Sequence, residues 1–274
     1  MSYPILLIGY DVESFPRSDK TVKFLEMIPR IHEEYSAPCS FFILGKTLLA
    51  HLEEFKKVYE EYSNLIDFEQ HTFSHIVFKN LVIEYRNYMF KKGSSIDEIR
   101  VEVRATSGIM EIFFGFRPIG LTTPWGHYRG LLDRPDILKA LWDLGIRFVR
   151  SWARNERDSL PVSLDKQPFW YDSINKIYPP ILECMIQGWH DNALKERLSD
   201  RNEYIEYIKR NIDYIAEKKL VWSYVQHDHS SFWKDPNLDI VRTMIEYAFD
   251  KGVKIVSYKQ FYENKLSERL RYMT

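Results

Sequence analysis

The feature that most constrains the fold is an alternation of short apolar runs and longer amphipathic segments along the whole chain. The apolar runs predict strands at residues 4–10, 39–44, 65–68, 116–121, 146–152, 181–186, 220–225 and 253–257. The amphipathic segments predict helices at residues 18–35, 46–62, 95–113, 133–144, 201–217 and 238–249. Repeated strand–helix units pair their strands in parallel, so we expect an α/β fold built as a barrel or a doubly wound sheet.

No linker or shift in composition divides the chain, and its 274 residues are 45% hydrophobic, which is enough for one large core. We therefore expect a single domain over residues 1–274. The segment 155–180 is rich in Pro, Asp, Ser and Gln and is long for a connection, which predicts a functional loop or a rim insertion. Cys39 and Cys184 lie in apolar runs, which predicts buried thiols rather than a disulfide.

Charge and hydropathy argue against two classes of partner. The formal net charge is -1 and no run of Lys or Arg occurs, so nucleic acid is not an expected partner. No apolar run approaches the roughly 20 residues that a membrane helix needs, so no membrane partner is expected either. The first residues lack a charged stretch followed by a cleavage site, which leads us to expect a cytoplasmic protein.

Polar residues follow several of the predicted strands at the point where each strand ends. They are Asp11 and Glu13, His71 and His75, Arg117 with the segment 122–126, the segment 189–191, and the triplet 227–229. In a parallel barrel these ends open on one face, where such enzymes place their chemistry. The pattern therefore predicts one active site, although single members of the set could equally cap loops or form surface ion pairs.

The pair His71 and His75 follows the third predicted strand. If this stretch opens a helix, residues four apart lie on one face, and two imidazoles at that spacing can bind one divalent metal. Thr72 stands where a metalloprotease signature requires Glu. Such a pair also arises in chains that bind no metal, so the spacing alone leaves the site open.

Several segments together resemble the polysaccharide deacetylases, carbohydrate esterase family 4. They are Tyr10-Asp11-Val12-Glu13, Phe41-Phe42-Ile43-Leu44-Gly45, His71-Thr72-Phe73-Ser74-His75, Thr123-Pro124-Trp125-Gly126 and Val225-Gln226-His227. The segment 182–191 also resembles the intracellular branch, which includes peptidoglycan-deacetylase-like and allantoinase-like proteins. The resemblance implies a distorted (β/α)7–8 barrel, in agreement with the number of predicted strands.

The resemblance also implies roles for individual residues. Glu13, His71 and His75 would bind a divalent metal, with Zn²⁺ favoured over Ni²⁺ or Co²⁺. Asp11 would act as the base and His227 as the acid. A second set, Trp125 and Trp189, would form a wall against the acyl methyl group or the sugar ring.

Two departures from the family pattern stand out. The usual pair of adjacent aspartates is replaced by Asp11 and Glu13 with Val12 between them, which makes Glu13 the expected third ligand. The Arg that usually orients the base is replaced by Thr122, and Arg117, five residues earlier, is the candidate to substitute for it.

The leading hypothesis is a metal-dependent hydrolase of non-peptide carbon–nitrogen bonds that removes acetyl groups from an amino sugar. The substrate could be a small molecule or an oligosaccharide, and the sequence leaves open whether the chain forms a homo-oligomer. Two alternatives remain: a metal-independent, allantoinase-like ureide hydrolase, and a carbohydrate-binding homologue whose catalysis is impaired by the missing motif Arg.

Overall fold

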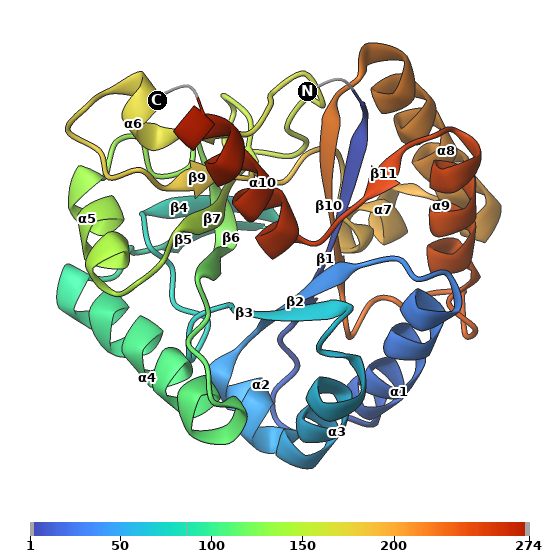
Figure 1. Cartoon of the computed structure of the whole chain (residues 1–274), viewed down its shortest axis with the longest axis horizontal. Coiled ribbons are helices and arrows are strands. Elements are labelled where there is room, and N and C mark those ends of the chain that lie inside the picture. Colours follow the sequence, from blue (N-terminus) through green and yellow to red (C-terminus); the bar gives the residue numbers. More distant parts are fainter. Residues whose placement is uncertain (1–2, 86, 272–274) are drawn as a thin grey trace.

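The computed structural model describes residues 3–85 and 87–271, and it shows strands curled into a barrel-like sheet with helices around the outside (Figure 1). The strands are β1 Ile5–Val12, β2 Cys39–Ile43, β3 Ile66–Gln70, β4 Leu81–Tyr85, β5 Asn87–Lys91, β6 Gly120–Tyr128, β7 Phe148–Arg154, β8 Phe169–Trp170, β9 Leu182–Glu183, β10 Val221–His227 and β11 Lys254–Ile255. The helices are α1 Asp19–Glu34, α2 Gly45–Ala50, α3 Leu52–Tyr62, α4 Ile96–Phe114, α5 Pro135–Asp143, α6 Tyr171–Ile174, α7 Asp191–Arg197, α8 Arg201–Lys218, α9 Asp239–Asp250 and α10 Tyr258–Arg271.

The main sheet is parallel over most of its width. Its strands follow the order β10-β1-β2-β3-β6-β7-β9, with β8 added as an antiparallel edge and β11 paired to β1. In the β1–β10 ladder, Asp11 is the register partner of His227. The expected deacetylase-type barrel is therefore confirmed, and parallel pairing brings the carboxyl ends of these strands to one face.

The curled sheet is bridged where β9 approaches β10. The backbone N–H of Gln187 donates to the carbonyl of Ser223 at 3.2 Å, and the N–H of Ser223 donates to Oε1 of Gln187 at 2.8 Å. Gln187 thus pairs with the backbone N–H and carbonyl of Ser223, which a continuous strand ladder would otherwise have paired. This side of the barrel is therefore closed by a side-chain hydrogen bond as well as a backbone one.

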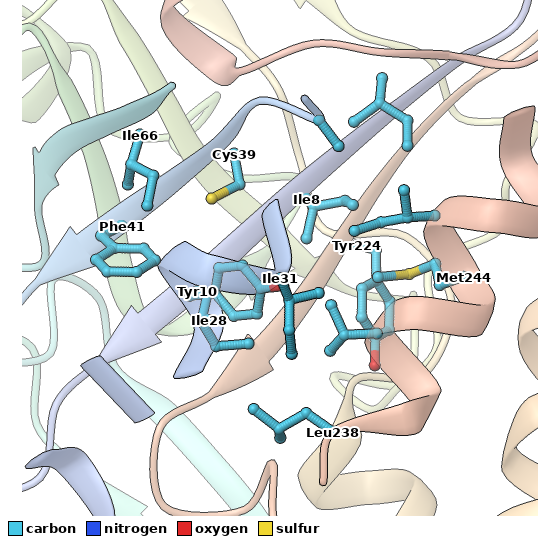
Figure 2. Packing of buried hydrophobic residues seen from close by; sticks show 14 of the residues in the cluster. Ile8, Tyr10, Ile28, Ile31, Cys39, Phe41, Ile66, Tyr224, Leu238 and Met244 are labelled. Atoms are coloured by element: carbon cyan, nitrogen blue, oxygen red, sulfur yellow. The ribbon is translucent and has the colours of Figure 1, made fainter. Parts of the chain in front are cut away.

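Side chains of β1 alternate between the barrel interior and the surrounding helices. Ile8 and Tyr10 pack outward with Ile28 and Ile31 of α1 in the largest buried cluster (Figure 2). Leu7 belongs to a separate cluster inside the barrel. This two-residue period explains why Asp11, two positions after Gly9, points into the barrel mouth.

Helix α10 packs against the barrel strands. Tyr258 and Phe261 of this helix are buried together with Leu7, Phe42 and Phe148 from three strands. Figure 1 shows α10 lying across the strands at the front of the view. The apolar contacts of α10 fill the interior beneath the polar residues of the mouth.

The segment between His71 and His75 does not form the helix that the spacing suggested. Residues 71–80 form neither a helix nor a strand, and both Thr72 (φ 64°) and His75 (φ 66°) adopt left-handed backbone conformations. Left-handed φ values interrupt the repeat of an α-helix. The two imidazoles therefore meet through a tight loop rather than through one helix face.

The fourth predicted strand lies later in the chain than expected. Residues 116–121 were predicted as the strand and 122–126 as the loop after it, whereas β6 runs from Gly120 to Tyr128. The ladder with β7 shifts register between Thr122 and His127. At this irregularity Trp125 has a φ of 68°, which turns its side chain out of the sheet and leaves it 40% exposed.

Other elements were either missed or confirmed. The hairpin β4–β5 and helix α10 were not predicted from the sequence. Pro29 lies inside α1, which nevertheless continues as one helix from Asp19 to Glu34. Ser95 and Glu98 form a reciprocal capping box at the start of α4.

Cys39 and Cys184 are both buried and unpaired, as predicted. Over the described part of the chain, no helix combines the length and the apolar character required to cross a bilayer.

Glu69 is a buried carboxyl group that links pH to stability. Its Oε2 accepts the N–H of Gly120 at 2.6 Å, and burial, followed by the nearby Asp67, raises the pKa of Glu69 from 4.5 to about 8. The folded chain therefore binds a proton that the unfolded chain releases. This contribution is present at low pH and is lost as the pH rises from about 4.5 to about 8.

We expect Glu69→Gln to be more stable than the wild type at pH 8, because the amide keeps an acceptor for Gly120 and cannot ionise. Its free energy of unfolding should also vary less with pH, since one linked proton contributes at most about 1.4 kcal/mol per pH unit. Urea unfolding between pH 5 and pH 9 measures both effects. The exposed Glu60→Gln is the matched control, and a Glu69→Gln protein less stable than wild type at pH 8 would contradict the assignment.

Candidate active site

Three side chains from two strand ends converge at the barrel mouth. Glu13 follows β1, and His71 and His75 follow β3. Oε2 of Glu13 lies 2.9 Å from Nε2 of His71 and 3.0 Å from Nε2 of His75. These three residues form a group whose ligand atoms are close enough to hold one metal ion. The predicted ligand set is thus brought together by the fold.

Two carboxylates outside this set hold the loops that carry it. Glu102 of α4 accepts the backbone N–H and the hydroxyl of Ser74, each at 2.6 Å, within the loop that ends at His75. Asp228, just after β10, accepts the backbone N–H of Glu13 at 3.3 Å. Both loops are therefore anchored from neighbouring elements, which fixes the ligand side chains before any ion binds.

The donor set fits a divalent cation. Nδ1 of His71 lies 3.1 Å from the carbonyl oxygen of Thr122, which can only accept a hydrogen bond. In the neutral imidazole this contact places the hydrogen on Nδ1 and turns the lone pair of Nε2 toward the carboxylate of Glu13. With His71 neutral, two acceptors face each other at 2.9 Å, and a divalent cation bound by both would satisfy them. Two imidazoles with one carboxylate are ligands that Zn²⁺ accepts.

Asp11 lies beside this group and is paired with a buried arginine from another strand. Nη2 of Arg150, in β7, donates to Oδ1 of Asp11. Nε of Arg150 donates to Oγ1 of Thr122 at 3.1 Å. Thr122, which stands at the position of the family's motif Arg, is thus hydrogen-bonded to the arginine that contacts Asp11 in this chain. Both members of the pair are buried, and the pKa of Arg150 is raised because Asp11 and Tyr258 outweigh the effect of burial.

The prediction that Arg117 orients Asp11 is wrong. Arg117 precedes β6, at the opposite end of that strand from the mouth, and its side chain is 61% exposed. It donates to Glu111 through Nε at 2.9 Å and through Nη2 at 2.6 Å. It is a surface ion-pair partner, a role that a single charged residue near a helix end commonly has.

His227 at the end of β10 faces Asp11 across the mouth. Its Nε2 lies 3.9 Å from Oδ2 of Asp11, and its Nδ1 lies 2.6 Å from Oδ1 of Asp191. The other oxygen of Asp191 accepts the backbone N–H of His227 at 2.8 Å and the hydroxyl of Ser230. Asp191 therefore fixes both the position and the tautomer of the ring, leaving Nε2 directed into the cleft.

The two partners of this pair have pKa values that move in opposite directions. Burial alone would lower the pKa of His227, but the charge and hydrogen bond of Asp191, with Glu13 and Asp11 nearby, raise it to about 10. Burial alone would raise the pKa of Asp191, but His227 lowers it to about 2. Both shifts describe an ion pair, so His227 carries a proton at neutral pH.

The cleft above these residues has a volume of about 490 Å³, which suits a ligand of one or two sugar rings. Ala153, Ile186 and Val225 form a small buried apolar cluster in its lining. Trp125 and Trp189 also line the cleft, as predicted. The ring centroids of Trp125 and His75 lie 6.0 Å apart, so the side chain of Trp125 lies directly beside the group of Glu13, His71 and His75.

Segment 155–180 contributes to the rim, as its composition predicted. Asp158, Ser159 and Leu160 from this segment line the cleft. Two further residues of the site were not assigned from the sequence. Arg150 could have been noticed as a charged residue in the middle of an apolar strand, and Asp191 as the acid directly after His190.

The curled sheet and its surrounding helices match the barrel fold of the polysaccharide deacetylases. A crystal structure from Mycobacterium smegmatis that is named a polysaccharide deacetylase matches 98% of this chain and 92% of its own, with 14% sequence identity and a TM-score of 0.69. No family model matches the sequence, and no curated protein matches it.

Two further structures illustrate the range of this fold. The peptidoglycan deacetylase PdaC of Bacillus subtilis covers 99% of this chain and 96% of its own, with 14% identity and a TM-score of 0.53. A pseudoenzyme of the CE4 family from Bacillus anthracis covers 95% of this chain and 66% of its own, with 15% identity and a TM-score of 0.56. Similarity at this level of identity establishes the fold, whereas activity has to be argued from the site.

The packing around Arg150 leaves no room for a side chain at Gly9. A Cβ atom there would overlap Nη1 of Arg150 and lie 3.0 Å from the ring of Tyr258. We expect Gly9→Ala to displace Arg150 and to lower the free energy of unfolding by about 1–3 kcal/mol, as overpacking does. Urea unfolding measures this loss.

Gly108→Ala in α4 is the matched control, because a Cβ at that position meets nothing within 4 Å. It should leave stability unchanged or raise it by about 0.5–1 kcal/mol. Equal stability of Gly9→Ala and wild type would show that Arg150 is not confined as described.

Asp191→Asn should lower the pKa of His227 from about 10, because burial would then be opposed only by the charges of Glu13 and Asp11. NMR titration of the ring in metal-free protein measures the change. Asp97→Asn, an exposed position, is the control. A pKa that stays near 10 in Asp191→Asn would show that another group holds the proton.

Proposed function

We propose that this protein is a metal-dependent deacetylase that hydrolyses the amide of an N-acetylated amino sugar. The observation that carries the proposal is the arrangement of two groups in one cleft. The carboxylate of Glu13 faces the Nε2 atoms of His71 and His75, and Asp11 lies 3.9 Å from His227 beside them. A ligand set next to an acid–base pair is what metal-assisted amide hydrolysis requires.

In this mechanism Asp11 accepts the proton of the attacking water. Its carboxylate has two oxygens with different partners: Oδ1 is bound by Arg150, and Oδ2 faces His227 at 3.9 Å. The buried guanidinium fixes the orientation of Asp11, so Oδ2 is directed to the cleft, where it can receive a proton. Arg150 is therefore a positioning residue for the base.

His227 donates a proton to the departing amine. Its Nδ1 is occupied by Asp191, so the proton available for transfer is on Nε2, which faces the cleft. The ion pair with Asp191 keeps the ring protonated at neutral pH. A positioned acid of this kind commonly contributes about 10²–10⁴-fold to the rate.

A divalent metal held by Glu13, His71 and His75 would supply Lewis-acid chemistry, polarising the acyl oxygen and making water a stronger nucleophile at neutral pH. Zn²⁺ remains the favoured ion on its ligand preferences, with Ni²⁺ and Co²⁺ as alternatives. Polysaccharide deacetylases among the structural neighbours support the reaction type. A cytoplasmic location and the assignment to the intracellular branch remain predictions of the sequence.

A carbohydrate-binding pseudoenzyme is the second candidate, because one structural neighbour is described as a CE4 pseudoenzyme and this chain has Thr122 at the motif Arg position. Metal analysis of protein purified without chelator, followed by a screen of acetylated amino sugars, separates the possibilities. Bound metal with turnover supports the deacetylase. Sugar binding without turnover supports the pseudoenzyme, and turnover of cyclic ureides without metal supports the allantoinase-like alternative.

We expect Asp11→Asn to keep the metal and to lose at least about 10²-fold in deacetylation rate, because only the proton acceptor is removed. Glu13→Ala should lose the metal, because one of three protein ligands is missing. Metal stoichiometry and deacetylation rates of both variants, measured side by side, test this division of roles. Glu53→Ala, an exposed position, is the control.

The reverse result, with metal lost in Asp11→Asn and kept in Glu13→Ala, would make Asp11 the ligand. Because Asp11→Asn leaves Arg150 without its buried carboxylate, the unfolding midpoint of this variant has to be measured as well. A folded variant that retains metal separates a catalytic loss from a structural one.

A further inference from the structure

Arg154 is a buried cation in the wall of the cleft. It lies at the carboxyl end of β7, four residues after Arg150, and its side chain is only 9% exposed. Its Nε lies 3.3 Å from the carbonyl oxygen of Trp125 and 3.2 Å from that of Gly126, and its Nη1 donates to the carbonyl of Asp158 at 2.7 Å. These bonds hold the guanidinium in one orientation.

The charge of Arg154 is poorly compensated. The carboxylate of Asp158 approaches Nε only to 4.0 Å and is itself 39% exposed. Burial lowers the pKa of Arg154 despite this neighbour, whereas the pKa of Arg150, which is buried more deeply but has Asp11 in direct contact, is raised. A buried guanidinium bound mainly to neutral carbonyls is costly unless an anion approaches it.

The lining of the cleft also carries positive charge on α7. Lys195 and Arg197 of this helix line the same cavity, and the guanidinium of Arg197 lies 3.8 Å from the ring centroid of Trp189. Apart from Asp11 and Glu13, which the proposed mechanism uses, the acids in this lining are Asp158 and Glu196. The cations Arg154, Lys195 and Arg197 exceed these two remaining acids by one.

We propose that the substrate carries an anionic substituent, a carboxylate or a phosphate, and that Arg154 selects it. This inference rests on the proposed deacetylase function and specifies the class of amino sugar. Arg154 donates a hydrogen bond to the backbone carbonyl of Trp125, and the ring of Trp125 lies next to that of His75. An anion bound by Arg154 would therefore lie close to the amide that is hydrolysed. The planar guanidinium offers paired donors that match either anion.

The test compares three sugars that share the acetylated amine. N-acetylglucosamine is neutral, N-acetylmuramic acid adds a carboxylate, and N-acetylglucosamine 6-phosphate adds a phosphate. Dissociation constants from calorimetry and hydrolysis rates would be measured with Zn²⁺-loaded wild type, Arg154→Gln, Arg154→Lys and Arg157→Gln. Arg157 is an exposed residue of the same loop that does not line the cleft, so it controls for the change in net charge.

We expect wild type to prefer one anionic sugar over the neutral one by about 10–100-fold, the value of a charge-assisted hydrogen bond. Arg154→Gln should lose this preference, because its affinity for the anionic sugar should fall much more than its affinity for the neutral one. Arg154→Lys should keep part of the preference, and Arg157→Gln should match wild type. The anion that is preferred identifies the substituent.

Equal binding of all three sugars by wild type, or an equal loss for all three in Arg154→Gln, would overturn the role of Arg154. Neutral sugar turned over without an anionic preference would leave the deacetylase proposal standing and remove only this inference. Anionic preference in binding without any hydrolysis would keep this inference and refute the deacetylase proposal.

Discussion

The contact on which the site depends most is the buried pair of Arg150 and Asp11. Burying a guanidinium inside the barrel is costly unless a carboxylate meets it, and Asp11 is the carboxylate that meets Arg150. The pair in turn requires Gly9, two residues before Asp11 on β1, and the hydroxyl of Thr122 on β6. Because these partners come from different strands, the orientation of Asp11 is determined by the closed sheet rather than by its own loop.

Parallel pairing of β1 with β10 then determines what Asp11 faces. The register places it opposite His227, and Asp191 holds the far side of that ring. Two buried ion pairs therefore lie next to each other at the mouth: Asp11 with Arg150, and His227 with Asp191. Each leaves one polar atom directed to the cleft, which is how a rigid core can present a base and an acid a few ångströms apart.

Thr122 at the position of the motif arginine is interpreted differently from the sequence and from the structure. In the sequence, Thr122 suggests a lost catalytic group and favours an impaired homologue. In the structure, Arg150 from the next strand reaches the same carboxylate and hydrogen-bonds Thr122 itself. The interaction survives at a different position of the chain, so the absence of a motif residue is weak support for a pseudoenzyme here. Arg154, on the same strand, shows that β7 supplies charge to the cleft as well.

The sequence by itself determined a parallel α/β fold and placed Glu13 and the two histidines just after strands, because strand period and strand-end position are local properties. The barrel and the set of metal ligands were implied by the resemblance to the polysaccharide deacetylases. The sequence could not determine how His71 and His75 approach each other, since their loop adopts left-handed backbone conformations that spacing does not reveal. Nor could it choose between Arg117 and Arg150. Only the tertiary structure decided that choice, because one arginine is at the wrong end of its strand and the other is turned inward by sheet alternation.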